Sequence, residues 1–409
     1  DRCDEEAPAW HAVGVQAVRC HLYEGVAVPR PFVATLAGAA DTVAARPAQS
    51  VLEVADLAVH FPVRKGFLRR TVGHVKAVDG VSLRLQPGRT LALVGESGCG
   101  KTTVGKALLR LIDPTAGRLW LDGERYDTLP AQALQPLRRT VQMVFQDPFA
   151  SLDPRMRVGE IIEEGLAALG VGADHRARQA RVTELLERVG LSADMRWRYP
   201  HEFSGGQRQR IAVARALAVS PRVIVCDEPT SALDVSVQAQ LLNLMRELQR
   251  EEGLTYLFIT HNLAVVEYLA DEVAVMYLGR IVEEGPIEHV LGVPAHPYTR
   301  ALLAAVPRIE RAVGTVPDVG VAERGSSRVE AAGGEVVGRE VAAGDIPGAD
   351  STPAGTIMAD LPSPLAPPAG CHFHPRCPQA TDVCRIRYPE PADLGQGHRV
   401  RCHWPIVRR

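Results

Sequence analysis

Apolar and polar residues alternate from Val51 to about residue 93, with a Pro87-Gly88 turn inside this stretch. Alternation with a period of two is typical of strands that bury one face. Residues 222–228 and 255–260 instead contain short continuous apolar runs, which are typical of strands buried on both faces of a parallel sheet. The pattern therefore predicts strands between residues 51 and 93 and buried strands of a parallel sheet further along the chain.

A different period appears in residues 158–200, where apolar residues recur every three to four positions. This spacing is typical of amphipathic helices. We therefore expect helices in residues 158–200.

Both kinds of periodicity are lost in two stretches. Residues 26–50 are rich in Ala, Pro and Val and are predicted to be a linker. Residues 307–368 are rich in Ala, Gly, Val and acidic residues, and no aromatic residue occurs between Tyr298 and Phe373. Because such a composition buries too little apolar surface to order itself, we expect a flexible insertion there. The last residues, 369–409, are predicted to form a small Cys-rich C-terminal module.

Length and charge narrow the class of protein. At roughly 150 residues per domain, 409 residues correspond to two or three domains. The formal net charge of −2 does not favour a nucleic-acid partner. No apolar run approaches the roughly 20 residues that a membrane-spanning helix needs. If the protein serves a membrane process, partner chains must supply the path through the membrane.

A glycine-rich loop fits the pattern G-x-x-x-x-G-K-[ST] and lies between an apolar strand and a helical stretch. Glycines let the backbone wrap closely around phosphate oxygens, and the helix N-terminus favours an anion. Lys101 is expected to reach the β- and γ-phosphates of ATP, and Thr102 to bind Mg²⁺. The expected nucleotide-binding residues here are Gly95, Glu96, Ser97, Gly98, Cys99, Gly100, Lys101, Thr102 and Thr103.

Two carboxylates, Asp227 and Glu228, follow the apolar run at 223–226. Asp227 is expected to hold Mg²⁺, and Glu228 to orient and polarise the attacking water, because phosphoryl transfer mainly needs positioning and charge neutralisation. Paired acids after a strand also occur simply because they stabilise a helix N-terminus.

A third segment, Phe203 to Gln207, opens an amphipathic helix with a Ser-Gly-Gly turn. Ser204 can be an ordinary helix cap. The helix N-terminus can also bind phosphate. Since one nucleotide does not need two such cradles from one subunit, this segment is expected to close on a neighbouring subunit's nucleotide.

Together these segments resemble the nucleotide-binding domain of an ABC transporter over residues 51–306. The resemblance implies an α/β fold: a P-loop ABC ATPase core with an antiparallel β subdomain near residues 51–93 and a helical subdomain near residues 148–200. It implies a catalytic group of Glu228, Gln146 and His261, in which Gln146 senses Mg²⁺ and the membrane partner and His261 lies near the γ-phosphate. The resemblance implies further nucleotide contacts, with Phe61 stacked on adenine and Asp234 in the D-loop. The family signature corresponds to Ser204, Gly205, Gly206 and Gln207, and Phe203 before it replaces the usual Leu.

The resemblance also implies an assembly. Two such domains sandwich two ATP molecules head to tail, so the partners are a second ABC ATPase domain and two integral membrane permease subunits. An extracytoplasmic solute-binding protein takes part indirectly, and no nucleic acid is expected. The chain would lie peripherally on the cytoplasmic face of the cell membrane. The alternatives are the ATPase of an exporter and a soluble ABC ATPase acting on ribosomes or DNA.

Finer features resemble the dipeptide, oligopeptide and nickel importer branch: the sequence after Gln146, the segment at 296–307 and the cysteines near the C-terminus. In that branch the cysteines can hold an iron–sulfur cluster. Four thiolates suit either [4Fe–4S] or Zn²⁺ by ligand count, and the resemblance favours the cluster. The expected ligands are Cys371, Cys377, Cys384 and Cys402.

The N-terminus echoes the C-terminal cysteines. Cys3 and Cys20 are spaced almost like Cys384 and Cys402, both pairs open with Asp-x-Cys, and both end in Val-Arg-Cys-His. Chance is one explanation for so short a match. The other makes residues 1–25 the tail of a preceding homologous unit, so that the parent is a tandem fusion whose upstream half is the second ATPase domain.

Overall fold

The computed structural model describes residues 10–13, 16–19, 50–65, 70–305 and 362–406. The chain divides into two units, residues 1–47 and 48–409. The first contains an antiparallel hairpin of β1 (Trp10–Val13) and β2 (Gln16–Arg19). Several predictions fall outside the described residues. They concern Cys3 and Cys20, the linker up to residue 49 and the insertion up to residue 361.

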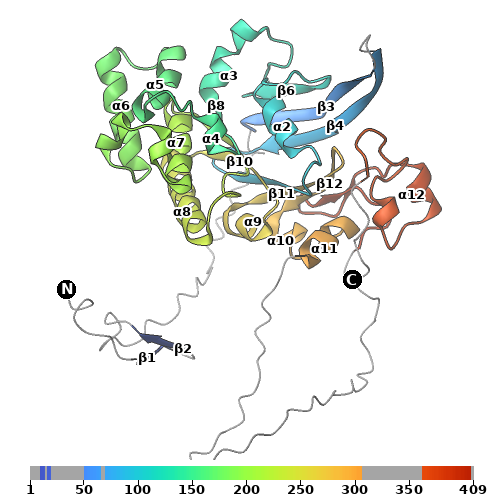
Figure 1. Cartoon of the computed structure of the whole chain (residues 1–409). Coiled ribbons are helices and arrows are strands. Elements are labelled where there is room, and N and C mark those ends of the chain that lie inside the picture. The colour runs from blue at the N-terminus through green and yellow to red at the C-terminus, as the bar shows by residue number, and fades with distance from the viewer. Residues whose placement is uncertain (1–9, 14–15, 20–49, 66–69, 306–361, 407–409) are drawn as a thin grey trace, which may run out of the picture. The chain divides into compact units, whose positions relative to one another are not determined.

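An eight-stranded sheet in the order β13-β14-β12-β11-β5-β10-β9-β8 forms the centre of the second unit (Figure 1). Its five strands from β11 to β8 are parallel to one another, and β12, β14 and β13 extend it antiparallel. Every residue of β5, β9 and β10 is buried, as their continuous apolar runs predict. The strands are β5 (Thr90–Val94), β8 (Val141–Val144), β9 (Val223–Asp227), β10 (Thr255–Thr260), β11 (Glu272–Tyr277), β12 (Arg280–Pro286), β13 (Ala392–Asp393) and β14 (Arg399–Val400).

A second, antiparallel sheet has the order β4-β3-β6-β7. Its long strands are β3 (Leu52–Lys65) and β4 (Arg70–Leu85), and β6 (Ala116–Leu121) and β7 (Glu124–Arg125) complete it. The expected range of 51–93 for the antiparallel subdomain is therefore wrong in two respects. β5 belongs to the parallel sheet because it is apolar on both faces, and two strands beyond residue 93 join the antiparallel one.

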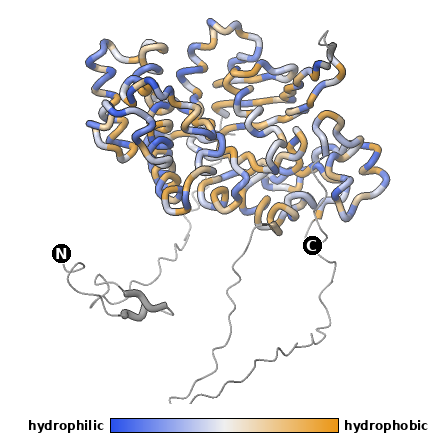
Figure 2. Tube along the Cα trace, in the orientation of Figure 1, coloured by the Kyte–Doolittle hydropathy of each residue, from blue (hydrophilic) through white to orange (hydrophobic). Residues whose placement is uncertain are grey.

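Helices cover the parallel sheet and form a group beside it, at the left of Figure 1. Along α5 and α6 hydrophobic and hydrophilic positions interchange, as Figure 2 shows, and their buried residues share one cluster with α7. The α-helices are α2 (Lys101–Leu108), α3 (Gln135–Thr140), α4 (Pro148–Ser151), α5 (Val158–Ala168), α6 (His175–Arg188), α7 (Gly205–Leu217), α8 (Val235–Glu252), α9 (Leu263–Leu269), α10 (Ile287–Val290), α11 (Pro297–Ala304) and α12 (Asp382–Ile386). Short 3₁₀ helices are η2 (Ala131–Leu134), η3 (Ala193–Trp197), η4 (Pro200–Glu202) and η5 (His374–Arg376).

The C-terminal segment, residues 362–406, continues the main sheet. β14 pairs with β12, and Phe373 is buried with Tyr277 and Tyr298 at ring centroid distances of 5.4 Å to each. The buried Glu283 carboxylate accepts hydrogen bonds from two backbone amides, at 2.7 and 3.0 Å, and contacts His398 Nε2 at 2.8 Å. The expectation of a small separate module is therefore not supported, since these residues gain their core from β11, β12 and α11.

Within the described ranges, no helix is both long and apolar enough to cross a membrane.

Candidate active site

Four parallel neighbouring strands bring the predicted catalytic residues together. The glycine-rich loop follows β5, His261 follows β10, Asp227 ends β9, and Gln146 lies two residues beyond β8. The strand order β5-β10-β9-β8 places these carboxyl ends side by side. Ligands of open α/β sheets bind at this edge. The candidate site is therefore a product of strand order, which the sequence alone does not display.

The loop between β5 and α2 (the P-loop) can adopt its path only with glycine at two positions. Gly95 has φ 153° and Gly100 has φ 108°, and a Cβ there would lie 2.2 Å from Met276 O and 2.0 Å from Ala77 O, respectively. α2 begins directly after Gly100, so its first amides face the loop. The P-loop thus presents a helix N-terminus suited to an anion.

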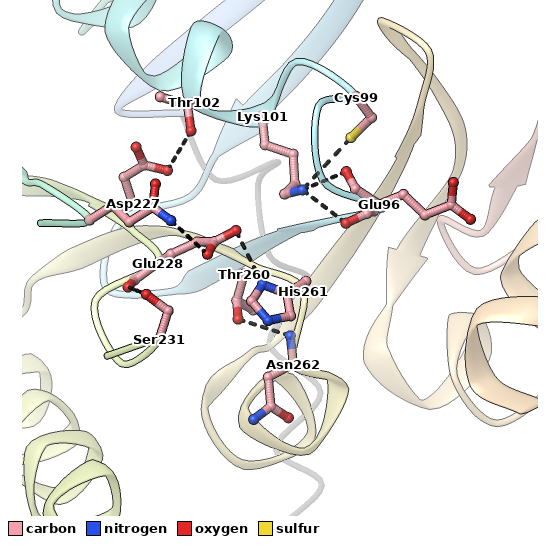
Figure 3. A network of polar contacts seen from close by, with 12 residues as sticks. Glu96, Cys99, Lys101, Thr102, Asp227, Glu228, Ser231, Thr260, His261 and Asn262 are labelled. Atoms are coloured by element: carbon pink, nitrogen blue, oxygen red, sulfur yellow. Dashed lines mark hydrogen bonds and ion pairs between the residues drawn. The ribbon is translucent and has the colours of Figure 1, made fainter. Parts of the chain in front are cut away.

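Lys101 lies at the centre of the loop (Figure 3). Its Nζ donates to Gly95 O at 2.8 Å and to Glu96 O at 2.9 Å, and it lies 3.8 Å from Cys99 Sγ. Burial raises the pKa of the Cys99 thiol. The buried ammonium is therefore held by the loop itself, in a place from which it can meet phosphate oxygens.

Thr102 joins the P-loop to β9. Its hydroxyl donates to Asp227 Oδ1 at 2.9 Å. Asp227 is only 2% exposed, and burial, together with the neighbouring charge of Glu228, raises the pKa of its carboxyl. A hydroxyl and a buried carboxylate at one place form part of an oxygen site suited to Mg²⁺, to which phosphates can add ligands.

Glu228 connects the remaining catalytic candidates. Its Oε2 accepts from Gln146 Nε2 at 3.1 Å, its Oε1 lies 3.2 Å from His261 Nδ1, and its carbonyl accepts from Ser231 Oγ at 3.0 Å. Figure 3 shows Glu228 between Asp227 and His261. The structure thus places Gln146, Glu228 and His261 in one group next to the metal-binding candidates.

The signature residues do not join this group. Ser204 caps α7 in a capping box: its hydroxyl accepts from Gln207 N at 3.3 Å, and its amide donates to Gln207 Oε1 at 3.0 Å. Asp234 caps α8 by a single hydrogen bond, which its Oδ1 accepts from Val237 N at 2.9 Å. Among the described residues no hydrogen bond links Ser204–Gln207 to the P-loop. Phe61 lies on β3 opposite Val75 and is 39% exposed.

Two residues at the site were not predicted. Tyr298, on α11, accepts a hydrogen bond from Glu96 N at 2.9 Å, and Arg376 makes an ion pair with Glu96. Nothing in the local sequence indicates that either residue reaches the P-loop, because the contacts span 202 and 280 positions.

The four C-terminal cysteines line one small cavity. His296, Phe373 and Trp404 are among the other residues that line it. Burial, with smaller effects from the neighbouring thiols, raises the pKa of Cys371 and of Cys402 to about 11. Yet no three or more Cys, His, Asp or Glu of the described residues are placed to hold one metal ion. The single-ion site that the Zn²⁺ alternative requires, with every sulfur about 2.3 Å from one point, is therefore not present.

Two families match the chain. The ABC transporter family matches residues 78–231, and the Oligopeptide/dipeptide transporter, C-terminal region, matches residues 282–332 and 346–384.

Three relatives extend this match. The oligopeptide transport ATP-binding protein AppF of Bacillus subtilis is 45% identical over 87% of this chain and 97% of its own length. The di/tripeptide transport ATP-binding protein DppF of Pseudomonas aeruginosa is 44% identical over 87% and 98%. The glutathione import ATP-binding protein GsiA of Salmonella typhimurium is 56% identical over 63% of this chain and 41% of its own length.

A solved structure agrees with the fold. The ATP-binding cassette MJ0796, in a dimeric post-hydrolysis state bound to ADP and phosphate, has a TM-score of 0.52 at 28% identity and covers 58% of this chain and 98% of its own. Fold and site together define a P-loop ATP hydrolase. The chain belongs to the ATP-binding proteins of ABC transporters, in the group that carries the oligopeptide/dipeptide C-terminal region.

Proposed function

We propose that ATP binding and hydrolysis by this chain power the uptake of peptides or similar small solutes through an ABC importer. The observation that carries the proposal is the similarity to AppF and DppF, which spans 97% and 98% of their lengths. It includes the C-terminal region matched to oligopeptide/dipeptide transporters. The exporter and soluble alternatives provide no reason for that region.

The test is uptake of labelled di- and tripeptides by cells that lack the native gene and express either wild type or Lys101→Ala. We expect uptake with wild type and loss of uptake with the variant. Equal uptake in both would contradict peptide import. ATP-dependent loss of peptide from preloaded cells would favour the exporter.

The geometry of the site supports a role for each residue. Lys101 and the P-loop would bind the phosphates, Thr102, Asp227 and Gln146 would surround Mg²⁺, and Glu228 would orient the water. His261 would sense the γ-phosphate through its contact with Glu228. Phe61 remains the candidate for adenine stacking because it is a partly exposed aromatic on β3.

The signature would act on a partner's nucleotide. Support comes from the hydrogen-bond pattern, which engages Ser204 only with its own helix. The dimeric state of the similar cassette MJ0796 also supports a second ATPase domain as partner. Two permease subunits at the cytoplasmic face of the membrane and a solute-binding protein outside it would complete the importer.

The cysteine cavity would hold a [4Fe–4S] cluster. Four thiols converge on one cavity, while a four-iron cluster needs one thiolate per iron and not four at one point. His296 supports the fit. Its Nδ1 accepts from Tyr298 N at 3.0 Å, so its buried Nε2, which has no partner in the described part of the chain, carries a proton to donate. Sulfide and thiolate are acceptors for such a proton. A cluster there would stabilise the C-terminal segment.

Anaerobic purification followed by iron, sulfide and zinc analysis tests this assignment. About four irons per chain, lost together in Cys377→Ser, are expected. Zinc without iron, or four reactive thiols without metal, would contradict it.

The domain division remains a proposal: 1–25 tail of a preceding unit, 26–50 linker, 51–306 nucleotide-binding domain, 307–368 insertion and 369–409 C-terminal residues. The hairpins support the tandem arrangement. When the cysteine pairs are aligned, His11↔Val18 and Ala12↔Ala17 of β1-β2 correspond to Ala392↔Val400 and Asp393↔Arg399 of β13-β14. Reading the parent gene upstream of Asp1 tests it, and absence of a second P-loop motif there would contradict it.

A further inference from the structure

Arg376 of the C-terminal segment reaches directly into the P-loop. Its Nη1 donates to Glu96 Oε2 at 2.8 Å and its Nη2 donates to Glu96 Oε1 at 2.9 Å. The arginine side chain is 6% exposed and the glutamate side chain 28%. Two parallel bonds between a guanidinium and a carboxylate fix orientation as well as distance. The carboxylate of Glu96 therefore has one defined position.

The other polar groups of Glu96 are also engaged. Its amide donates to the hydroxyl of the buried Tyr298 at 2.9 Å, and its carbonyl accepts from Lys101 Nζ at 2.9 Å. One residue of the P-loop is thus held by η5, α11 and α2 together. Because Lys101 bonds to the same peptide, displacement of Glu96 would displace the ammonium that the nucleotide site depends on.

The guanidinium itself lies beside one aromatic ring of β11 and one of the C-terminal segment. It lies 5.8 Å from the ring centroid of Tyr277 and 6.0 Å from that of Phe373. The turns around it are closed by backbone hydrogen bonds from His374 N to Cys371 O at 3.0 Å and from Arg376 N to Phe373 O at 3.0 Å. The position of Arg376 therefore depends on the turn between two of the cavity cysteines, Cys371 and Cys377.

We propose that Arg376 is a positioning residue for the ATP site. It holds the P-loop through Glu96 in the geometry that receives phosphates, so that the C-terminal segment sets the affinity of the chain for ATP. The inference rests on the proposed role of the P-loop and requires no metal. Binding linkage is reciprocal, so ATP must in turn affect the C-terminal segment.

If the contact between Arg376 and Glu96 only stabilised the fold, its loss would have different consequences. It would change the thermal midpoint of the nucleotide-free chain and leave the dissociation constant for ATP unchanged. A positioning contact changes the dissociation constant and KM, while kcat at saturating ATP stays close to that of wild type.

The experiment measures the dissociation constant for Mg-ATP by equilibrium dialysis on the full chain. The variants are Glu96→Gln, Arg376→Gln, Arg376→Lys and the double variant Glu96→Gln/Arg376→Gln. Lys101→Ala tests the P-loop itself, and Arg385→Gln, at an exposed arginine of the same segment, is the matched control.

We expect Glu96→Gln and Arg376→Gln each to weaken binding about tenfold, the scale expected for loss of a charge-assisted pair. Arg376→Lys should weaken it less, because it keeps the charge and loses the two parallel bonds. The double variant should bind Mg-ATP no more weakly than the weaker-binding of the two single variants, because each of the three variants breaks the same contact. Arg385→Gln should stay within about twofold.

The reciprocal measurement is the rate at which Cys377 is alkylated in the metal-free chain. Peptide mass spectrometry distinguishes alkylation of Cys377 from alkylation of Cys99. ATP should slow the reaction in wild type and have little effect in Glu96→Gln.

One result would overturn the inference and leave the P-loop assignment intact. In it, Glu96→Gln and Arg376→Gln both bind Mg-ATP as tightly as wild type, and only Lys101→Ala binds it weakly. Normal binding by Lys101→Ala would overturn the P-loop assignment itself. If circular dichroism shows that Arg376→Gln does not fold, Glu96→Gln alone decides, since it breaks the same contact with a side chain of equal size.

Discussion

Glu228 has a backbone conformation that most residues avoid, with φ at 44°. A non-glycine residue in this region costs on the order of 1 kcal/mol. Contacts at the end of β9 hold Glu228 in this conformation. Its amide donates to Ile259 O at 2.9 Å, and Gln146 and His261 contact its carboxylate. Such strain at a strand end is consistent with a side chain aimed at a reacting water.

Glu228→Gln should therefore retain ATP binding and lose hydrolysis. The amide keeps the size and the contact with Gln146 but cannot act as a base, so we expect turnover to fall by about 10² to 10⁴-fold. The measurement is phosphate release from the assembled transporter, with Glu247→Gln on the exposed side of α8 as control. Wild-type turnover in Glu228→Gln would remove this residue from the catalytic role.

Local motifs were sufficient to predict that the P-loop joins a strand to a helix and that a strand ends at Asp227 and Glu228, because these features depend on neighbouring residues alone. They were insufficient for Arg376 and Tyr298. A contact that spans 280 positions depends on how β12, β14 and α11 pack, and a single arginine in a Cys-rich segment carries no sign of its partner.

At the scale of elements, α7 presents a second helix N-terminus whose own cap is already satisfied. If this N-terminus serves a partner's nucleotide, Ser204→Arg should abolish turnover at the partner's site and leave nucleotide binding by this chain's P-loop intact. Steady-state turnover and ATP binding are measured on the same sample.

Ser204→Ala is the control, because it removes the cap at a cost of about 1 kcal/mol without adding bulk or charge. Loss of ATP binding to the chain's own P-loop in Ser204→Arg would indicate that the signature acts within one subunit.

The two sheets meet at Asp79 of β4. Its Oδ2 accepts from Arg280 Nη2 at 2.7 Å, and His60 Nε2 lies 3.2 Å from its Oδ1. Burial alone would raise the pKa of Asp79, but the hydrogen bond and charge of Arg280, aided by Lys76 and His60, lower it below the ordinary value of 3.8.

A lowered carboxyl pKa stabilises the folded state above the unfolded-state pKa, and this stability is lost as pH falls through the folded-state pKa. Asp79→Asn should lower the free energy of unfolding by about 1 kcal/mol at pH 7, since the pair is partly screened by solvent. Urea titrations should show the difference from wild type shrinking below pH 3.8.

Asp56→Asn, at an exposed position of the same sheet, is the control substitution. A difference between wild type and Asp79→Asn that grows as pH falls would contradict the assigned sign.

The period of apolar residues was a good guide to the type of element and a poor guide to which sheet it joins. The buried run of β5 and the alternating strands before it are adjacent in sequence, yet they belong to different sheets. The C-terminal segment has few apolar residues of its own, and its order depends on long-range pairing of β14 with β12, which periodicity does not report.

At the scale of the whole molecule, the proposed function requires that one chain supplies half of each ATP site. The P-loop, Asp227 and Glu228 would form one side, and the signature of a companion chain would form the other. A chain of this kind without its companion should be a weak ATPase, and the activity it has should require two chains to meet.

The most direct test is turnover per chain, measured over a wide range of chain concentration at saturating Mg-ATP, with light scattering to report the oligomeric state. We expect slow turnover that rises with concentration as dimers form, because each P-loop then gains a signature from the other chain. A chain that stays monomeric at every ATP concentration and yet hydrolyses ATP at the full rate of an assembled transporter would contradict it.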